Sequence, residues 1–173
     1  MSNLEKVQEF HLAFQQSVSS NVEPTKENKL LRLRLAFEEL CELAEALGVT
    51  DSFYSIIHEI SEESLSQEDT DVINKVEVLD ALCDIEYINN GTIVAFGLEK
   101  VYSEAFTEVH RSNMSKLCVS IEEALETKEN YKKQGISTIV EPMTNGYFAV
   151  KRESDNKVLK SINYKPFEGS KYL

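Results

Sequence analysis

"RLRLAFEELCELAEAL", residues 32–47, decides the fold, because an apolar helical pattern and a dense set of acids share this one segment. At about 100° per residue, its leucines and alanines fall mainly on one helical face. Four glutamates lie on the opposite face or at its edge: Glu38, Glu39, Glu42 and Glu45. Taken alone, this pattern favours a solvent-exposed acidic face. Leu31 and Leu35 also lie on the acidic side, which is typical of a helix buried on both sides, so the alternative is a metal site inside a helical bundle.

A second acidic helix is predicted for residues 72–97. Its charged residues between positions 76 and 95 are few: Glu77, Asp80, Asp84 and Glu86. The first three are spaced i, i+3 and i+7, so they form one stripe. Carboxylates this close repel one another, and buried ones are usually paired or bound to a metal. The stripe therefore favours a cation site facing residues 32–47, with Mg²⁺ as a suitable ion, over an acidic edge with salt-bridge partners.

The remaining helices follow from the same periodicity. Four segments carry it: residues 3–16, 27–47, 72–97 and 99–117. Gly48 is the expected C-cap of the second segment, and residues 51–71 are interpreted as a short helix followed by an acidic loop. Ser120, with Glu123 at the capping-box position, predicts the start of one more short helix.

The last part of the chain changes period. "STIVEPMTNGYFAV", residues 137–150, is rich in β-branched and aromatic residues. Turn signals stand at Asn145-Gly146 and again at Asp155-Asn156. This pattern predicts a small antiparallel hairpin or meander.

The composition is that of an ordinary globular domain, with a strong negative charge. The net charge is −12, from 18 basic and 30 acidic residues among 173, which argues against non-specific binding to nucleic acids or anionic membranes. No apolar run is long enough for a membrane span, and "MSNLEKVQEF" lacks the regions of a signal peptide. The three cysteines form no CxxC pair, so we expect reduced thiols in a cytoplasmic protein and no zinc site.

The two acidic segments resemble a known signature. "EELCE" (38–42) and "EVLDALCD" (77–84) look like the paired ExxE and ExxD motifs of the all-α nucleoside triphosphate pyrophosphohydrolases, which are MazG-like or phosphoribosyl-ATP pyrophosphohydrolase-like. "EVHRSNMSKL" (108–117) and "KVLKSINYKPF" (157–167) resemble features of one subgroup.

The resemblance implies an all-α fold, a helical bundle of MazG-like type, that assembles as a homodimer or homotetramer. Residues 1–117 would form the core, with an insertion at about 49–71. Residues 118–173 would be an extension of the same domain, made of the short helix and the hairpin.

The resemblance also implies Mg²⁺-dependent cleavage of a nucleoside triphosphate to its monophosphate and pyrophosphate, with Mn²⁺ as a substitute ion. The implied cellular role is the removal of non-standard or excess nucleotides. Matching positions assign the metal ligands to Glu39, Glu42, Glu77 and Asp80. Glu38, together with Glu39, would be catalytic: Glu38 is a further ligand or the carboxylate that orients or deprotonates the attacking water. Asp84 would support the ligands from one turn away.

Substrate contacts follow from "RSNMSK". Asn113 and Lys116 match positions that contact the nucleotide or its phosphates, and Arg111 is a third candidate. For the neighbouring His110 we favour a structural role over a phosphate contact. Two alternative functions stay open, namely hydrolysis of phosphoribosyl-ATP and nucleotide binding without catalysis.

Overall fold

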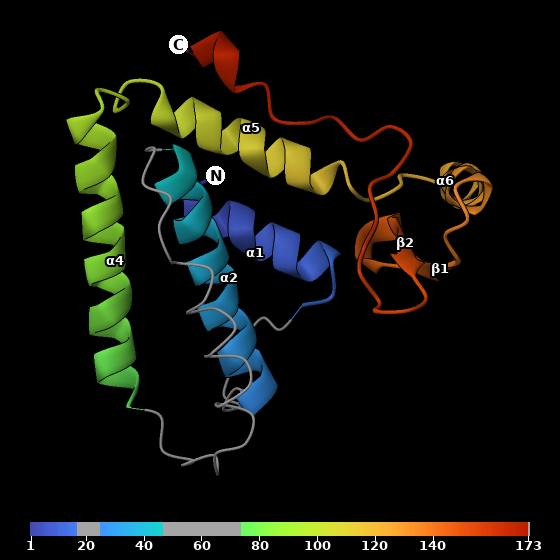
Figure 1. Cartoon of the computed structure of the whole chain (residues 1–173), viewed down its shortest axis with the longest axis horizontal. Coiled ribbons are helices and arrows are strands. Elements are labelled where there is room, and N and C mark those ends of the chain that lie inside the picture. The colour runs from blue at the N-terminus through green and yellow to red at the C-terminus, as the bar shows by residue number, and fades with distance from the viewer. Residues whose placement is uncertain (17–24, 47–73, 173) are drawn as a thin grey trace. The chain divides into compact units, whose positions relative to one another are not determined.

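The computed structural model describes residues 1–16, 25–46 and 74–172, which Figure 1 draws in colour. The described helices are α1 (Asn3–Ala13), α2 (Lys26–Ala46), α4 (Lys75–Ala95), α5 (Tyr102–Met114) and α6 (Ile121–Lys133). The strands β1 (Thr138–Pro142) and β2 (Phe148–Arg152) and the 3₁₀ turns η1 (Thr144–Gly146) and η2 (Gly169–Tyr172) complete them. The predicted mainly helical fold with a small C-terminal hairpin is thus confirmed. The Gly48 cap and the predicted helix and loop at 51–71 lie outside the described residues.

The chain divides into two compact units, residues 1–19 with 84–173 and residues 20–83. In the first unit, α1 and α5 lie side by side (Figure 1). α1 begins with a capping box, in which Ser2 and Glu5 each bind the other's backbone amide. Lys6, which is buried, donates from Nζ to Thr107 Oγ1 at 2.8 Å, so a polar contact joins the two helices.

The predicted hairpin forms where the turn signal placed it. β1 and β2 pair antiparallel, with Val140 opposite Val150. Asn145 and Gly146 take the positive φ angles of 59° and 81° that reverse the chain, which is why these residue types occur there. The second signal also marks a turn, because Asn156 has a φ of 57° and Lys157 O accepts from Arg152 N at 2.9 Å.

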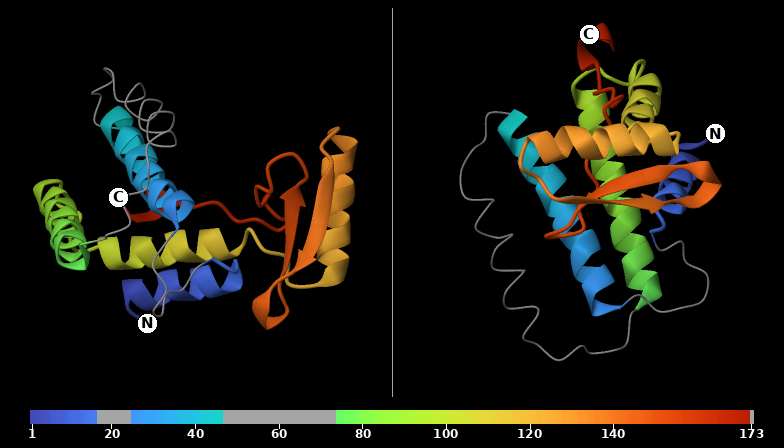
Figure 2. Two further views of the ribbon diagram at one scale, coloured as in Figure 1. Left: turned by 90° about the horizontal axis from the view of Figure 1, so that it is seen from below. Right: turned by 90° about the vertical axis from the view of Figure 1, so that its right-hand side faces the viewer.

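Helix α6 covers one face of this sheet (Figure 2). It begins at the predicted Ser120, whose hydroxyl accepts from Glu123 N at 3.2 Å. Glu123 reaches back one residue further than a capping box requires and accepts from Val119 N at 3.0 Å. The core beneath the helix consists of buried Cys118, Ala124 and Val150 with half-buried neighbours.

A second core cluster joins the end of α1 to the hairpin. Its buried members are Ala13, Leu117, Met143 and Ala149. Thr144 Oγ1 strengthens this junction by donating to Leu12 O at 2.6 Å. Two segments far apart in the sequence are therefore fixed to the stretch that follows α5.

Three predicted helices end earlier than their periodicity suggested. α4 ends at Ala95 rather than residue 97, because Gly97 turns to a φ of 69°. α1 ends at Ala13 rather than residue 16, because Gln15 turns to a φ of 53°. α5 ends at Met114 rather than 117, because Cys118 pairs with Phe148 through two backbone hydrogen bonds of 2.8 and 2.9 Å. At the end of α5 a tertiary contact therefore ends the helix, although apolar residues still continue the pattern.

Helices α2 and α4 leave large apolar side chains uncovered. On α4 these side chains are between 48% and 73% exposed: Val76, Val78, Leu79, Leu82, Ile85 and Ile88. Leu40 and Leu43 of α2 are 45% and 38% exposed, whereas Cys41 of the same turn is buried. None of the described helices combines the length and apolar character that crossing a membrane requires.

Candidate metal and nucleotide site

The acids of α2 occupy two adjacent turns of an uninterrupted helix. Glu38, Glu39 and Glu42 are all exposed there. Glu38 Oε1 lies 3.5 Å from Arg34 Nε, an i, i+4 pair in which both side chains are about half exposed. Because solvent screens such a pair, Glu38 stays available for other contacts.

The acids of α4 form the predicted stripe, since α4 is continuous through Glu77, Asp80 and Asp84. All three are exposed. Asn74 precedes the helix, and its Oδ1 accepts from Val76 N at 3.2 Å and Glu77 N at 3.4 Å. Glu77 therefore lies in the first turn, where the helix dipole favours a negative charge.

Each helix brings its own carboxylates together. Within the ranges that the structure describes, no group of three or more His, Cys, Asp or Glu residues is placed to hold a metal ion. The ligand set Glu39, Glu42, Glu77 and Asp80 therefore stays a prediction. Its donor chemistry fits Mg²⁺, because all four side chains are carboxylates and Mg²⁺ is bound through oxygen.

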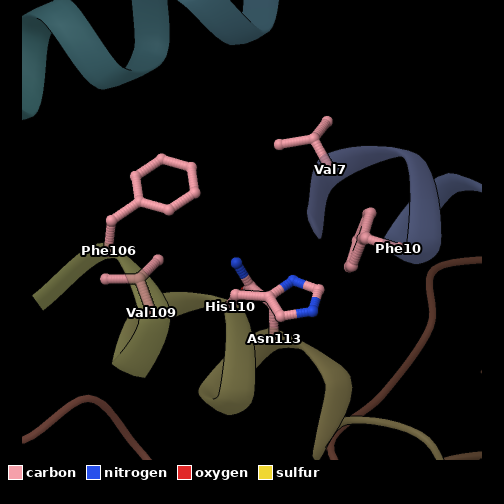
Figure 3. A pocket seen from close by; sticks show the side chains of 6 residues that line it. All are labelled: Val7, Phe10, Phe106, Val109, His110 and Asn113. Atoms are coloured by element: carbon pink, nitrogen blue, oxygen red, sulfur yellow. The ribbon is translucent and has the colours of Figure 1, made fainter. Parts of the chain in front are cut away.

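The "RSNMSK" motif presents two faces of the end of α5. One face carries Asn113, whose Oδ1 accepts from Lys116 Nζ at 2.8 Å, so two predicted nucleotide contacts lie together. Asn113 and His110 also reach into a small pocket of about 100 Å³ between α5 and α1 (Figure 3). Its other lining residues are apolar: Val7, Phe10, Phe106 and Val109.

His110 has a partner on the neighbouring helix. Its Nε2 lies 3.2 Å from Glu9 Oε2, and its side chain is only 15% exposed. This contact joins α1 to α5, in keeping with the structural role that the sequence favoured for His110.

The other face of α5 carries Arg111, and its guanidinium is already engaged. Arg111 donates to both carboxylate oxygens of Glu108, at 2.8 and 2.5 Å, and to Pro166 O at 3.2 Å. Lys171 Nζ lies 3.2 Å from the same carboxylate. In this arrangement Arg111 binds the C-terminal tail, and the prediction that it contacts nucleotide is untested.

These cations change the acidity of Glu108. The hydrogen bonds from Arg111 are the main cause that lowers the pKa of Glu108 from 4.5 to about 2, burial opposes them, and Lys171 adds to them. A carboxyl with a depressed pKa stabilises the folded chain above its unfolded pKa and loses that contribution as the pH falls.

We therefore expect Glu108→Gln to be less stable than the parent at about pH 6, and the difference to shrink between about pH 4.5 and pH 2. Urea denaturation at about pH 6 and pH 3 measures both differences. Glu126→Gln is the matched control, since Glu126 is exposed on α6. An equal difference between Glu108→Gln and the parent at both pH values would contradict the ion-pair account.

Sequence reasoning missed Ser112, Ser115 and Tyr164. Ser112 is 5% exposed and donates from Oγ to Tyr164 Oη at 3.2 Å. Lys165 N donates to Ser115 Oγ at 3.0 Å. The signal was the joint presence of "RSNMSK" and "KVLKSINYKPF", two motifs that prove to be in contact.

A comparison with known protein families decides the relationship. The model of the family described as phosphoribosyl-ATP pyrophosphohydrolase matches residues 7–113. The chain belongs to this family. It thereby falls within the MazG-like, all-α superfamily of nucleoside triphosphate pyrophosphohydrolases, as its motifs indicated. The match to the phosphoribosyl-ATP pyrophosphohydrolase family includes both acid pairs and Asn113, and it stops before Lys116 and the tail.

One curated relative is similar to part of the chain. "Uncharacterized protein L479" of Acanthamoeba polyphaga mimivirus is 37% identical over 78 residues. These cover 42% of this chain and 30% of that protein, so the match spans less than a third of the relative's length. No solved structure matches the chain significantly.

Proposed function

We propose that this protein is a Mg²⁺-dependent nucleoside triphosphate pyrophosphohydrolase that releases the monophosphate and pyrophosphate. The observation that carries the proposal is membership of a pyrophosphohydrolase family over residues 7–113, a span that contains both acid pairs on long helices. Mn²⁺ is the expected substitute ion. Removal of non-standard or excess nucleotides in the cytoplasm is the proposed role, and the free state of all three cysteines is compatible with a reducing compartment.

The proposed metal ligands are carboxylates from two helices. Glu39 and Glu42 of α2, with Glu77 and Asp80 of α4, hold the ion, and Asp84 supports them from the next turn. When bound, Mg²⁺ supplies positive charge against the phosphate oxygens. Glu38 is a further ligand, or it orients the attacking water and accepts its proton. Its exposed carboxylate, weakly held by Arg34, is free to take either role.

The end of α5 supplies the contacts to the nucleotide. Lys116 provides a compact positive charge for a phosphate, and the Asn113 amide can donate to and accept from a base or a sugar hydroxyl. Their mutual hydrogen bond of 2.8 Å places the two groups together before substrate arrives. Arg111 contributes to the nucleotide only if it leaves Glu108.

Assembly as a homodimer or homotetramer is part of the proposal. The exposed apolar side chains of α4 support it, because a folded protein that exposes many large apolar side chains on one helix commonly covers them with a partner. A second copy of the chain is the partner we propose for it. No nucleic acid is expected in the complex, given the net charge of −12.

A second candidate is hydrolysis of phosphoribosyl-ATP, which the description of the matching family favours. It would use the same carboxylates. The "RSNMSK" motif and the tail favour the nucleoside triphosphate reading instead. A protein that binds nucleotide without hydrolysing it is the remaining alternative.

The experiment measures pyrophosphate release from canonical, deoxy- and modified nucleoside triphosphates and from phosphoribosyl-ATP, each with Mg²⁺ and with a chelator. We expect metal-dependent release with stoichiometric monophosphate from one or more nucleoside triphosphates. Turnover of phosphoribosyl-ATP alone would establish the second candidate. Nucleotide binding without any release, measured by calorimetry, would establish the third.

A further inference from the structure

We propose that the C-terminal strap, defined as residues 157–167, positions Asn113 and Lys116 by holding the last turn of α5. This inference rests on the proposed function, since it concerns the nucleotide contacts of that same site. The strap lies beyond the residues that match the family, yet it runs along α5 and binds the motif that carries those contacts (Figure 1).

Ser115, directly after α5, is the first anchor. A helix end leaves its last carbonyls without intrahelical partners, so it frays unless other groups bind them. Ser161 Oγ donates to Ser115 O at 3.1 Å, and Ser115 Oγ donates to Ser112 O at 2.7 Å. Lys165 N in turn donates to Ser115 Oγ at 3.0 Å. The strap therefore binds the Ser115 carbonyl directly, and it holds the Ser115 hydroxyl that binds the Ser112 carbonyl.

Tyr164 is the second anchor. Its hydroxyl accepts from Ser112 Oγ at 3.2 Å, and Ser112 is buried. The Tyr164 ring is itself covered by Lys160, whose Nζ lies 4.5 Å from the ring centroid. Tyr164 is thus held on both sides, and it closes over the serine that directly precedes Asn113.

Arg111 is the third anchor, through its hydrogen bond to Pro166 O at 3.2 Å. The pair with Glu108 fixes the guanidinium for this contact, since two parallel hydrogen bonds set its plane. A planar fork of this kind keeps its direction better than a lysine would.

The first residues of the strap are hydrogen-bonded to strand β2 and helix α6. Leu159 N donates to Val150 O at 2.8 Å, and Ile162 N donates to Thr127 Oγ1 at 3.1 Å. Tyr131 Oη donates to Lys160 O at 3.0 Å. The strap therefore connects the packed core of α6 and the sheet to the end of α5, which restricts the motion of that end.

The residues of α5 that bind the strap differ from the residues that are proposed to contact the nucleotide. Positions 108, 111, 112 and 115 face the strap, whereas Asn113 and Lys116 bind each other and Asn113 lines the pocket on the other side. Strap residues therefore act on the nucleotide through α5. Losing them should weaken substrate binding and leave the carboxylates of α2 and α4 unchanged.

Two variants test the proposal, Tyr164→Phe, which removes one hydroxyl, and Ser115→Ala. We expect each to raise the KM for the best nucleoside triphosphate about tenfold with kcat nearly unchanged, as loss of binding that is equal in ground and transition states does. Ser115→Thr, which keeps the hydroxyl, should restore the KM. Tyr172→Phe is the matched control, because its hydroxyl binds Glu104 O outside the strap.

Amide hydrogen exchange without nucleotide is the second readout. In Tyr164→Phe and Ser115→Ala, the amides of residues 115–117 should exchange faster, while those of α6 keep their rates. Unchanged exchange would overturn the proposal, and so would an unchanged KM in an active parent. A parent that releases no pyrophosphate from any substrate would instead overturn the proposed function, and this inference with it.

Discussion

Glu39→Gln and Asp80→Asn are each expected to lower metal-dependent pyrophosphate release by more than about a hundredfold. Loss of a group that only orients a metal ligand typically costs 10- to 100-fold, so loss of a direct ligand should cost more. Both side chains are exposed, and the amide replacements are nearly isosteric, so the fold should be unaffected. Steady-state rates at several Mg²⁺ concentrations measure the effect, and circular dichroism checks the helices.

The matched controls stand on the same helices outside the proposed ligand set. Glu45→Gln on α2 and Glu86→Gln on α4 each remove one exposed carboxylate. Their rates should stay within about twofold of the parent, because neither carboxylate belongs to the proposed ligand set and both are exposed to solvent. Equal loss in ligand and control variants would show that total negative charge, rather than particular ligands, supports the reaction. Full activity and full metal affinity in Glu39→Gln and Asp80→Asn would refute the site.

Leu117→Ala is expected to destabilise the unit built from α1, α5, α6 and the hairpin by about 2–5 kcal/mol, the usual cost of truncating a buried leucine. Leu117 is 2% exposed and packs with Ala13, Met143 and Ala149, small or flexible neighbours that cannot fill a leucine-sized space without moving. Guanidinium denaturation followed by circular dichroism measures the loss. Such a cost is a large part of the stability of a typical domain, which is about 5–15 kcal/mol.

Leu125→Ala is the control for this prediction. Leu125 lies on α6 and is 55% exposed, so its truncation should change the free energy of unfolding by about 0.5 kcal/mol or less. If Leu117→Ala were no worse than Leu125→Ala, the cluster around Leu117 would not be the core that fixes α1 to the hairpin.

Much of the fold could be predicted because it depends on neighbours in the sequence. The acid stripes of α2 and α4 follow from 3.6 residues per turn once those segments are helical. Ser120 begins α6 because its side chain binds an amide three residues away. Asn145 and Gly146 turn the hairpin because they tolerate positive φ.

Helix ends were less predictable than helix positions. The periodicity of α5 runs on to Leu117, yet Cys118 must extend to pair with Phe148, thirty positions later in the chain. The local sequence pattern shows only that Leu117 is apolar. Whether Leu117 belongs to a helix face or to the core beneath a hairpin depends on where that distant strand lies.

The sequence by itself determined which residues are candidates for chemistry, namely the acids of two helices and an asparagine and a lysine one turn apart. It also determined that the tail contains β-structure. Only the tertiary structure decided what faces the two sides of α5. Arg111 donates hydrogen bonds to Glu108 and Pro166, and Ser112 donates to Tyr164, 52 positions later in the chain. The reason is physical, since helical spacing fixes neighbours within a turn or two, whereas a partner some fifty residues distant depends on the path of all the chain between.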